Sequence, residues 1–361
     1  MRAWSYKGRG QPADVLNLTS DFTTPSPSNL GPNDVLVKIE YTAFTPSASA
    51  LISILPNWIH TLPAVPELAF SGAIAALGSN VAAKRPELTI GAPVFGTTST
   101  QLYLKGHGAL ADYCPCPAVQ VAVIPSSISF RDAAALAGNG VTAVEVLEAL
   151  GLKKGDKILI NGGSGATGTM LVQCARAIVG ESGRVVATCS EGNSEMVKRI
   201  GADETIDYRK HDPLHEYLAK EHSETRFDAI ADTVGIQDLY AHSPEYLREN
   251  GRFVNIGAMQ VQSGLQGLFG YMWSQCVNLL WPKILGGTPR WYKMVTATPN
   301  QSTLSRLGEL AKKGLLTPMI DSEWEMEDVL EAYKKLHSQR AKGTILIRVP
   351  KQSSGSANVY T

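Results

Sequence analysis

The octapeptide NGGSGATG, residues 161–168, restricts the fold of this chain more than any other stretch. Its glycines have the spacing G-x-G-x-x-G, and it directly follows the apolar run KILI. We expect Gly163 to allow a tight turn, Gly165 to admit a diphosphate close to the backbone, and Gly168 to let a helix pack on the strand. Free N–H groups and the positive end of that helix would then hold the anion, whereas the alternative is a structural turn that binds no nucleotide. The cofactor-binding residues predicted in this loop are Gly163, Ser164, Gly165, Ala166, Thr167 and Gly168.

Strands and helices alternate from about residue 125 onward. We expect strands at Lys157–Asn161 and Arg184–Thr188 and in the segments ETIDY, FDAIADTVG and GRFVNIGA, with RWYKMVTATP as a sixth. Helices are expected at Gly165–Val179 and Ser194–Ile200. A run of β-α units is what a doubly wound parallel sheet requires, so this part is predicted to be a Rossmann-type α/β domain. Before this point the sequence indicates short strands and turns, as in Val35–Tyr41, where polar and apolar residues alternate.

Composition excludes several classes of protein. The chain of 361 residues has a formal net charge of zero, which gives no indication of nucleic acid or of an anionic membrane as a partner. Its first residues, MRAWSYKG, contain no apolar signal core. The five cysteines are odd in number and lie mostly in apolar segments, which favours reduced thiols in an intracellular, cytoplasmic protein over a disulfide framework.

The position about 20 residues after the glycine loop discriminates between the two nicotinamide dinucleotides. An NAD site usually has an acidic residue there for the ribose hydroxyls, whereas this chain has the neutral segment Thr188–Ser190. Since an acidic residue would repel the 2′-phosphate of NADP, its absence favours NADPH. Glu191 and Glu195 oppose this prediction, because they flank the same turn while the nearest cations, Arg209 and Lys210, lie on another strand. The predicted hydrogen-bond donors to the phosphate are Ser190, Asn193 and Tyr208.

Several longer stretches, among them GDKILINGGSGATGTMLVQCARA, VVATCSEGNSEMVKRIGADETIDY and RAKGTILIRV, resemble the medium-chain dehydrogenase/reductase superfamily. Within it the chain is similar to the zinc-free, quinone-oxidoreductase-like branch found in fungi, from about residue 30 to 349. The resemblance implies a mainly β, GroES-like catalytic domain (1–125 and 300–361) interrupted by the Rossmann domain (126–299), with the cofactor in the cleft between them. The last residues, about 351–361, are expected to form a disordered tail. By motif match the resemblance implies further cofactor contacts at Thr142, Val234, Gly257, Ala258, Lys342, Gly343 and Thr344.

Zinc-dependent members of this superfamily need cysteine and histidine ligands at positions where this chain has none. The matching stretches, TAFTPSASAL and PELAFSGAI, lack both residue types, and residues 80–112 contain no cysteine. Cys114 and Cys116 provide only a C-x-C pair, whereas tetrahedral zinc requires three or four nitrogen or sulfur ligands. We therefore predict no bound metal and interpret His60 and His107 as surface or loop histidines.

The residues expected to meet the substrate differ from those of the quinone-oxidoreductase-like branch, although the residues expected to bind the cofactor resemble it. Without zinc to stabilise an alkoxide, the resemblance implies hydride transfer to an activated C=C bond or to a quinone. The Asn-Pro-x-Asp of related quinone and alkenal reductases is Thr45-Pro-Ser47-Ala here, and LISILPNWIH lacks the tyrosine proton donor of related enoyl reductases. The usual lysine of the phosphate turn is replaced by EGN. Thr45 and Ser47 are the candidates for polar substrate contacts. Tyr41 could serve as such a contact or could simply pack as a strand residue, and the sequence favours neither.

The apolar segment Leu265–Leu285 is the remaining unusual feature. Its apolar residues fall on one helical stripe, while an opposite polar face and Pro282 argue against a membrane-spanning helix. Three interpretations remain open: a helix packed on the cleft or across a dimer contact, a lid over a bulky lipophilic substrate, or a patch that touches a lipid surface. The sixth strand would pair across a homodimer, as it often does in the superfamily.

These features together predict a cytosolic, NADPH-dependent and zinc-independent reductase of an activated alkene or quinone, with a lipophilic small-molecule substrate. One alternative is an NADPH-binding regulator or membrane-associated partner with little turnover, which the altered catalytic stretch keeps open. Another is a pathway-specific enoyl reductase of fungal secondary metabolism, acting with a synthase.

Overall fold

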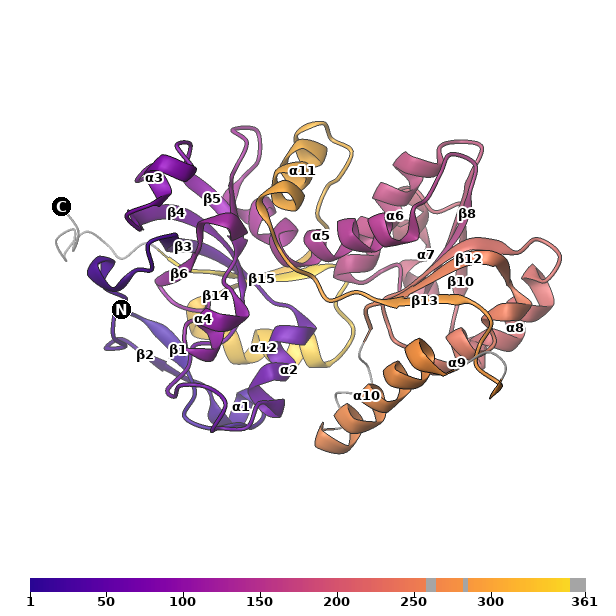
Figure 1. Cartoon of the computed structure of the whole chain (residues 1–361), viewed down its shortest axis with the longest axis horizontal. Helices are drawn as coiled ribbons and strands as arrows, with labels where there is room; N and C mark the ends of the chain where they lie inside the picture. Colours follow the sequence, from indigo (N-terminus) through magenta and orange to yellow (C-terminus); the bar gives the residue numbers. More distant parts are fainter. Residues whose placement is uncertain (258–263, 282–284, 351–361) are drawn as a thin grey trace. The chain divides into compact units, whose positions relative to one another are not determined.

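The computed structural model of the chain describes residues 1–257, 264–281 and 285–350 (Figure 1). Contacts between Cα atoms divide it into two compact units. Unit 1 comprises Met1–Val141 and Pro299–Thr361, and unit 2 comprises Thr142–Thr298. The chain therefore builds unit 2 from one continuous segment and completes unit 1 only after it. The expected tail at 351–361 lies outside the described residues.

A parallel sheet of six strands forms the centre of unit 2. The central strands are nearly continuous apolar runs, typical of a sheet covered on both faces, and Leu159, Val186 and Ile230 are completely buried. The winding reverses between the first and fourth strands in chain order, which confirms the predicted doubly wound Rossmann fold. In spatial order the strands are β10 (Glu204–Asp207), β9 (Arg184–Cys189), β8 (Lys157–Asn161), β11 (Phe227–Asp232), β12 (Leu247–Asn255) and β13 (Trp291–Met294).

Helices connect these strands, and the expected ones begin close to their predicted residues. The helix after the glycine loop begins at Ala166, with Gly165 as its N-cap, and the next begins at Ser194. The helices of unit 2 are α6 (Ala166–Val179), α7 (Ser194–Arg199), α8 (Leu214–His222), α9 (Gln237–Ala241) and α10 (Gly264–Leu280), and α5 (Phe130–Leu150) runs from unit 1 into unit 2.

Unit 1 is built on a second, mainly antiparallel sheet, in agreement with the predicted GroES-like catalytic domain. Its strands run in the order β14 (Ile320–Glu325), β15 (Thr344–Arg348), β3 (Asp34–Ala43), β4 (Ala69–Leu77), β5 (Pro93–Thr97) and β7 (Val121–Val123), and β6 (Tyr113–Pro117) also pairs with β3. A small ribbon joins β1 (Ala3–Ser5) to β2 (Asn17–Thr19). The helices are α1 (Pro12–Val15), α2 (Pro46–Ile54), α3 (Val81–Lys84), α4 (Thr100–Leu104), α11 (Gln301–Lys312) and α12 (Val329–His337). Because β15 pairs with β3, the sheet joins the two ends of the chain.

Helix α5 is long and apolar enough to cross a membrane by length and composition, the single such helix among the described residues. In the structure 72 % of its most apolar window is buried inside the protein, as in the core helix of a folded domain. None of the five cysteines is in a disulfide in the structure, and all are buried except Cys276.

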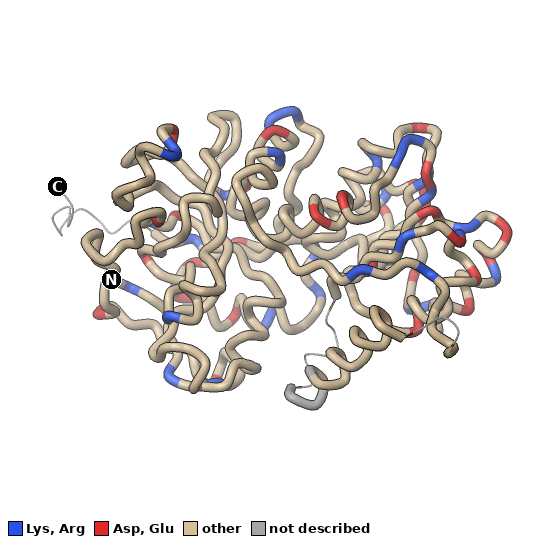
Figure 2. The backbone as a smooth tube through the Cα atoms, in the orientation of Figure 1, with Lys and Arg blue, Asp and Glu red and all other residues tan. Residues whose placement is uncertain are grey.

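Helix α10 exposes its apolar stripe and packs its polar side against the rest of unit 2. Phe269 and Trp273 are 74 % and 63 % exposed, whereas Gln275 is 4 % exposed. Figure 2 shows the helix without a Lys, Arg, Asp or Glu along its described length. The stripe is therefore not part of the core of unit 2, because polar groups of the sheet hold the opposite side of the helix. Packing on the cleft or across a dimer contact, the lid and the lipid patch all stay predictions.

Candidate functional site

The glycine loop joins β8 to α6 at the carboxyl edge of the parallel sheet. Two hydrogen bonds tie it to the end of β9: the N–H of Gly162 donates to Oγ1 of Thr188, and the N–H of Gly163 donates to the Thr188 carbonyl, both at 2.8 Å. The chain reverses at Gly162, whose φ of 82° lies in the left-handed region that favours glycine. Gly163 lies in the same turn, as predicted, while the left-handed conformation itself falls one position earlier, at Gly162.

The three glycines of the motif are required for different reasons. A Cβ on Gly163 would lie 2.7 Å from the Cβ of Ala187, and one on Gly168 would lie 2.1 Å from the carbonyl oxygen of Gly162. Both distances are too short for real side chains, so these glycines let strand, loop and helix pack together. A Cβ on Gly165 would lie 3.5 Å from that same oxygen, which is an ordinary contact. The protein itself leaves space at Gly165, where the predicted diphosphate would approach.

The N-terminus of α6 adjoins this space. Its N-cap, Gly165, has φ −77° and ψ 172° and has no side chain to accept from the first N–H groups. The first N–H groups of an α-helix point away from it along its axis and carry the positive end of its dipole. The donor set therefore fits the diphosphate of a nicotinamide dinucleotide.

A buried polar network joins the ends of three neighbouring strands behind the loop. Asn161 of β8 donates to Oδ1 of Asp232 on β11 at 2.8 Å and accepts from the hydroxyl of Thr188 on β9 at 2.6 Å. Asp232 is 1 % exposed and also accepts the N–H groups of residues 234, 235 and 236 at 2.9, 3.0 and 2.9 Å. Burial raises the pKa of Asp232, and these hydrogen bonds oppose the rise. The sequence predictions missed this network, whose signal is a polar residue at the end of each apolar strand.

Asp232 shapes the turn that contains Val234, one of the predicted cofactor contacts. A Cβ on Gly257 would lie 2.0 Å from the carbonyl carbon of Val234, so these two predicted residues touch through their backbones. Oδ1 of Asn255 accepts the N–H of Gly257 at 2.8 Å and holds it there. The structure thus brings Val234 and Gly257 to the carboxyl edge that carries the glycine loop, while the predicted contact Ala258 lies outside the described residues.

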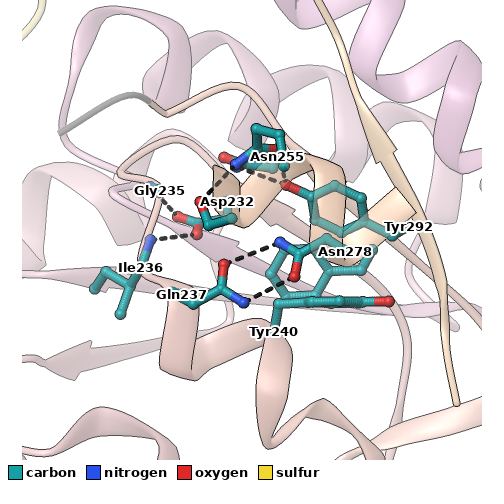
Figure 3. A pocket seen from close by; sticks show the side chains of 11 residues that line it. Asp232, Gly235, Ile236, Gln237, Tyr240, Asn255, Asn278 and Tyr292 are labelled. Carbon is teal, nitrogen blue, oxygen red and sulfur yellow. Dashed lines mark hydrogen bonds between the residues drawn. The ribbon is translucent and has the colours of Figure 1, made fainter. Parts of the chain in front are cut away.

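A small pocket lies beside this turn, lined by residues of the sheet edge and of α10 (Figure 3). Gln237 and Asn278 hold each other through two hydrogen bonds of 2.8 and 2.9 Å. Tyr292 of β13 donates to Gln275 and accepts from Asn255 at 2.9 Å. These polar groups bind one another and leave few free for a ligand. We therefore interpret the pocket as structural: its hydrogen bonds hold α10 and the 233–236 turn in place.

The turn after β9 carries the groups predicted to meet the 2′-phosphate. Ser190 and Asn193 are partly exposed there, and Tyr208 is exposed at the end of the neighbouring β10. Lys210 reaches the same turn, since its Nζ lies 2.8 Å from Oε1 of Glu191, and this contact raises the pKa of Lys210. Lys210 follows β10, a different strand from the one before the turn, and it still reaches the turn because β10 lies directly beside β9.

In unit 1 a predicted substrate residue and a predicted cofactor residue adjoin the same pair of strands. The N–H of Phe44 donates to the carbonyl of Ile345 at 3.0 Å at the end of the β3–β15 pairing, and Thr45 and Thr344 are the next residues in the chain on each side. Thr45 is the N-cap of α2, because its hydroxyl oxygen accepts the N–H of Ala48 at 3.3 Å. The hydroxyl proton of Thr45 is not used in that bond, so it can be donated to a substrate.

The other predicted residues of unit 1 have mixed exposure. Ser47 and Lys342 are exposed. Thr344 is fully buried, and its Oγ1 lies 3.5 Å from Nδ2 of Asn139. Gly343 has φ 112°, so it has a backbone reason to be glycine. In unit 2, Thr142 is a partly buried residue of α5. The roles of these residues toward a cofactor stay predictions.

Glu67 is a buried carboxyl group beside Thr45 that the sequence predictions missed. It is 0 % exposed and has φ 63°, in the left-handed region that side-chain-bearing residues seldom adopt. Its Oε2 accepts the N–H of Thr45 at 3.2 Å, and its Oε1 accepts the hydroxyl of Tyr333 at 2.8 Å. Burial raises the pKa of Glu67 to about 8, although both hydrogen bonds oppose the rise. Its sequence signal is a single acidic residue in the apolar segment PAVPELAF.

Zinc does not fit the side chains seen in the structure. The described residues contain no group of three or more His, Cys, Asp or Glu that could hold a metal ion. Cys114 and Cys116 are buried on β6, and burial raises the pKa of Cys114 to about 12, which disfavours the thiolate that a metal needs. His60 lies in a loop and is buried against Tyr6, with ring centres 5.7 Å apart. His107 is half-buried, which lowers its pKa.

Models of two known domain families match this chain. Residues 31–126 match the alcohol dehydrogenase GroES-like domain, and residues 200–347 match the family described as zinc-binding dehydrogenase. The first match lies in unit 1, and the second begins in unit 2 and ends in β15 of unit 1. The pair of matches agrees with a Rossmann domain inserted into a GroES-like domain.

Individual proteins match over nearly the whole chain. Trans-enoyl reductase poxH of Penicillium oxalicum is 36 % identical over 98 % of both chains. A chloroplastic NADPH-dependent alkenal/one oxidoreductase of Arabidopsis thaliana is 26 % identical over 96 % of this chain and 79 % of its own. Among solved structures, a quinone oxidoreductase from Coxiella burnetii superimposes with a TM-score of 0.78 and 24 % identity, over 97 % of this chain and 99 % of the other.

Proposed function

Because the chain belongs to the medium-chain dehydrogenase/reductase superfamily, in its zinc-free, quinone-oxidoreductase-like branch, we propose that it uses NADPH to reduce the C=C bond of an α,β-unsaturated carbonyl compound. That it is a reductase with a nicotinamide cofactor follows from the family. The choice of NADPH and the enone or enoyl substrate are the proposal. The observation that carries the substrate class is the full-length similarity to a trans-enoyl reductase.

The cofactor would be held mainly by the carboxyl edge of unit 2. The loop from Gly163 to Gly168 binds the diphosphate, with the space at Gly165 as the point of closest approach. Val234 and Gly257 contact the nicotinamide end of the cofactor. The hydrogen bond from Val234 to Asp232 positions the first, and backbone packing against Val234 positions the second. A bound NADPH supplies the hydride. Further contacts are proposed at Thr142 and at Lys342, Gly343 and Thr344.

The residues expected to meet the adenosine end of the cofactor favour NADPH over NADH. The strand end before the turn, Thr188–Ser190, carries no carboxylate that would repel a 2′-phosphate. Ser190, Asn193 and Tyr208 donate hydrogen bonds, and Lys210 supplies a cation that already reaches this turn. The relative described as NADPH-dependent supports the same choice.

Activation of the substrate is assigned to the altered catalytic stretch. A conjugated carbonyl accepts hydride at its β-carbon without a metal, because the negative charge moves to the carbonyl oxygen. The hydroxyl of Thr45 donates a hydrogen bond to that oxygen, and Ser47 contacts the polar end of the substrate. A proton from water then reaches the α-carbon and completes the saturated product. The exposed apolar stripe of α10 suits a lipophilic substrate or a second copy of the chain joined at β13, an edge strand.

A substrate panel tests this proposal. Purified protein is assayed for oxidation of NADPH and of NADH with an acyclic enone, a thioester enoyl compound, a quinone and a saturated ketone. We expect turnover with the enone or the enoyl thioester, a preference for NADPH, and none with the saturated ketone. Turnover of the quinone alone would move the function to quinone reduction. Tight NADPH binding without turnover of any compound would refute the proposal and support a regulatory protein.

A further inference from the structure

We propose that Glu67 is a positioning residue of the substrate site, which acts through Thr45 and whose proton sets the upper pH limit of turnover. The inference rests on the proposed reductase function, in which Thr45 contacts the substrate. It concerns a different residue, however, and it is tested by pH dependence instead of by the presence of activity.

The backbone conformation of Glu67 would favour glycine, so the glutamate side chain must be retained for another reason. A left-handed φ costs a residue with a side chain about 1 kcal/mol or more, and such strain concentrates at functional sites. Gln339 is the other non-glycine residue with positive φ in the described part of the chain, and it is exposed just after α12. Glu67 is completely buried, so it combines backbone strain with the burial of an ionisable group.

The two oxygens of Glu67 bridge elements that are far apart in the sequence. One accepts the backbone N–H of Thr45 at the start of α2, and the other accepts the hydroxyl of Tyr333 on α12. The ring of Tyr333 stacks on Phe44 with centres 4.3 Å apart, so the residue before Thr45 is held as well. The backbone of Glu67 is itself fixed, because its carbonyl accepts the N–H of Ala109 at 2.8 Å. Glu67 therefore determines where Thr45 sits.

The surroundings of Glu67 favour its neutral form. The titratable groups that interact with it are the phenols of Tyr333 and Tyr103, and the phenol of Tyr6 lies 3.1 Å from that of Tyr103. Burial raises the pKa of all three tyrosines. The imidazole of His337 on α12 packs beside Tyr333, with ring centres 6.1 Å apart, and its Nε2 lies 2.9 Å from the Ser49 hydroxyl. No cation forms an ion pair with Glu67 among the described residues. With a pKa of about 8, the carboxyl group keeps its proton at neutral pH.

The proton decides how well Thr45 is held. In the neutral acid the carbonyl oxygen accepts from Thr45, and the O–H group can be shared with the Tyr333 oxygen. Loss of the proton leaves a buried charge that has these two donors within the described part of the chain, which favours rearrangement or entry of water. A glutamine reproduces the neutral pattern at every pH, since its oxygen accepts from Thr45 and its NH2 group donates to Tyr333.

The pH dependence of enone reduction tests the inference. KM and kcat for an acyclic enone at saturating NADPH are measured from pH 6 to 10 in the parent protein, Glu67→Gln and Tyr333→Phe. We expect the parent KM to rise about tenfold above pH 8, and we expect no such rise in Glu67→Gln. In Tyr333→Phe the rise should move to higher pH, because the tyrosine hydrogen bond lowers the pKa of Glu67. The dissociation constant of NADPH should stay the same in all three.

Control variants separate the carboxyl group from backbone strain and from a general loss of charge. Glu67→Gly relaxes the left-handed backbone but removes both oxygens, so its KM should be high at every pH. Glu181→Gln changes an exposed glutamate of unit 2 and should keep the parent profile. An unchanged alkaline rise in Glu67→Gln overturns the inference; if that variant does not fold, an unshifted rise in Tyr333→Phe does so. Absence of turnover in the parent protein with every enone, enoyl compound and quinone refutes the proposed function itself.

Discussion

Replacing Gly165 by valine tests whether the glycine loop binds a diphosphate or is only a turn. The backbone at Gly165 is extended, with φ −77° and ψ 172°, a conformation that valine adopts without strain. The new Cβ would lie 3.5 Å from the carbonyl oxygen of Gly162, so the protein accepts it. The two γ-methyl groups would instead extend into the space at the N-terminus of α6. We therefore expect the substitution to affect the ligand and not the fold.

The expected loss of NADPH affinity is about a hundredfold, or roughly 2–3 kcal/mol, because the diphosphate is pushed away from the helix N-terminus. At a cofactor concentration of about 100 times the parent dissociation constant, NADPH stabilises the parent by about 2.7 kcal/mol. At the same concentration the variant would gain only about 0.4 kcal/mol by the same relation. The assay is thermal unfolding of both proteins with and without NADPH, together with calorimetric titration.

Gly168→Ala is the matched control. A Cβ there would lie 2.1 Å from the backbone carbonyl oxygen of Gly162, so this change should lower the unfolding temperature even without cofactor. If Gly165→Val is stabilised by NADPH as strongly as the parent protein, the loop is only a structural turn and the cofactor site has been assigned to the wrong place. If Gly165→Val unfolds as early as Gly168→Ala without cofactor, the space inferred at Gly165 does not exist.

Four further predictions follow from the same geometry. Calorimetry should show NADPH bound at least about tenfold more tightly than NADH, roughly 1.4 kcal/mol, and Ser190→Asp should shift this preference towards NADH through repulsion of the phosphate; equal affinities in the parent would contradict it. Lys210→Ala should weaken NADPH and leave NADH unchanged, whereas an equal loss for both would assign the lysine a structural role. Elemental analysis should find no stoichiometric zinc, and a chelator should leave activity unchanged; one zinc per chain would refute the metal-free mechanism. Because the folded pKa of Glu67 is about 8 against 4.5 for an ordinary glutamate, the free energy of unfolding should fall as pH rises between these values, by a few kcal/mol at about 1.4 kcal/mol per pKa unit. Urea unfolding across this pH range should show the fall in the parent and not in Glu67→Gln.

The sequence by itself determined the Rossmann sheet and the place of its glycine loop. These features depend on residues that are neighbours in the chain, namely apolar runs, the helices between them, and glycines three to five positions apart. Local periodicity therefore sufficed for β8, β9 and α6, whose ends were predicted to within one residue. The resemblance to known reductases rests on the same local stretches. The order of the strands in space then follows from general rules of winding.

Only the tertiary structure decided which residues support the site. Glu67 and Tyr333 are 266 positions apart, and Asn161 and Asp232 are 71 apart, so no local pattern links them. Lys210 reaches the turn after β9 because β9 and β10 are adjacent in the sheet, although the linear sequence separates them. The sequence could not tell which face of α10 packs inward, for the same reason. Apolar periodicity shows only that one face of the helix differs from the other. Which face packs inward depends on polar partners such as Tyr292, brought there by folding.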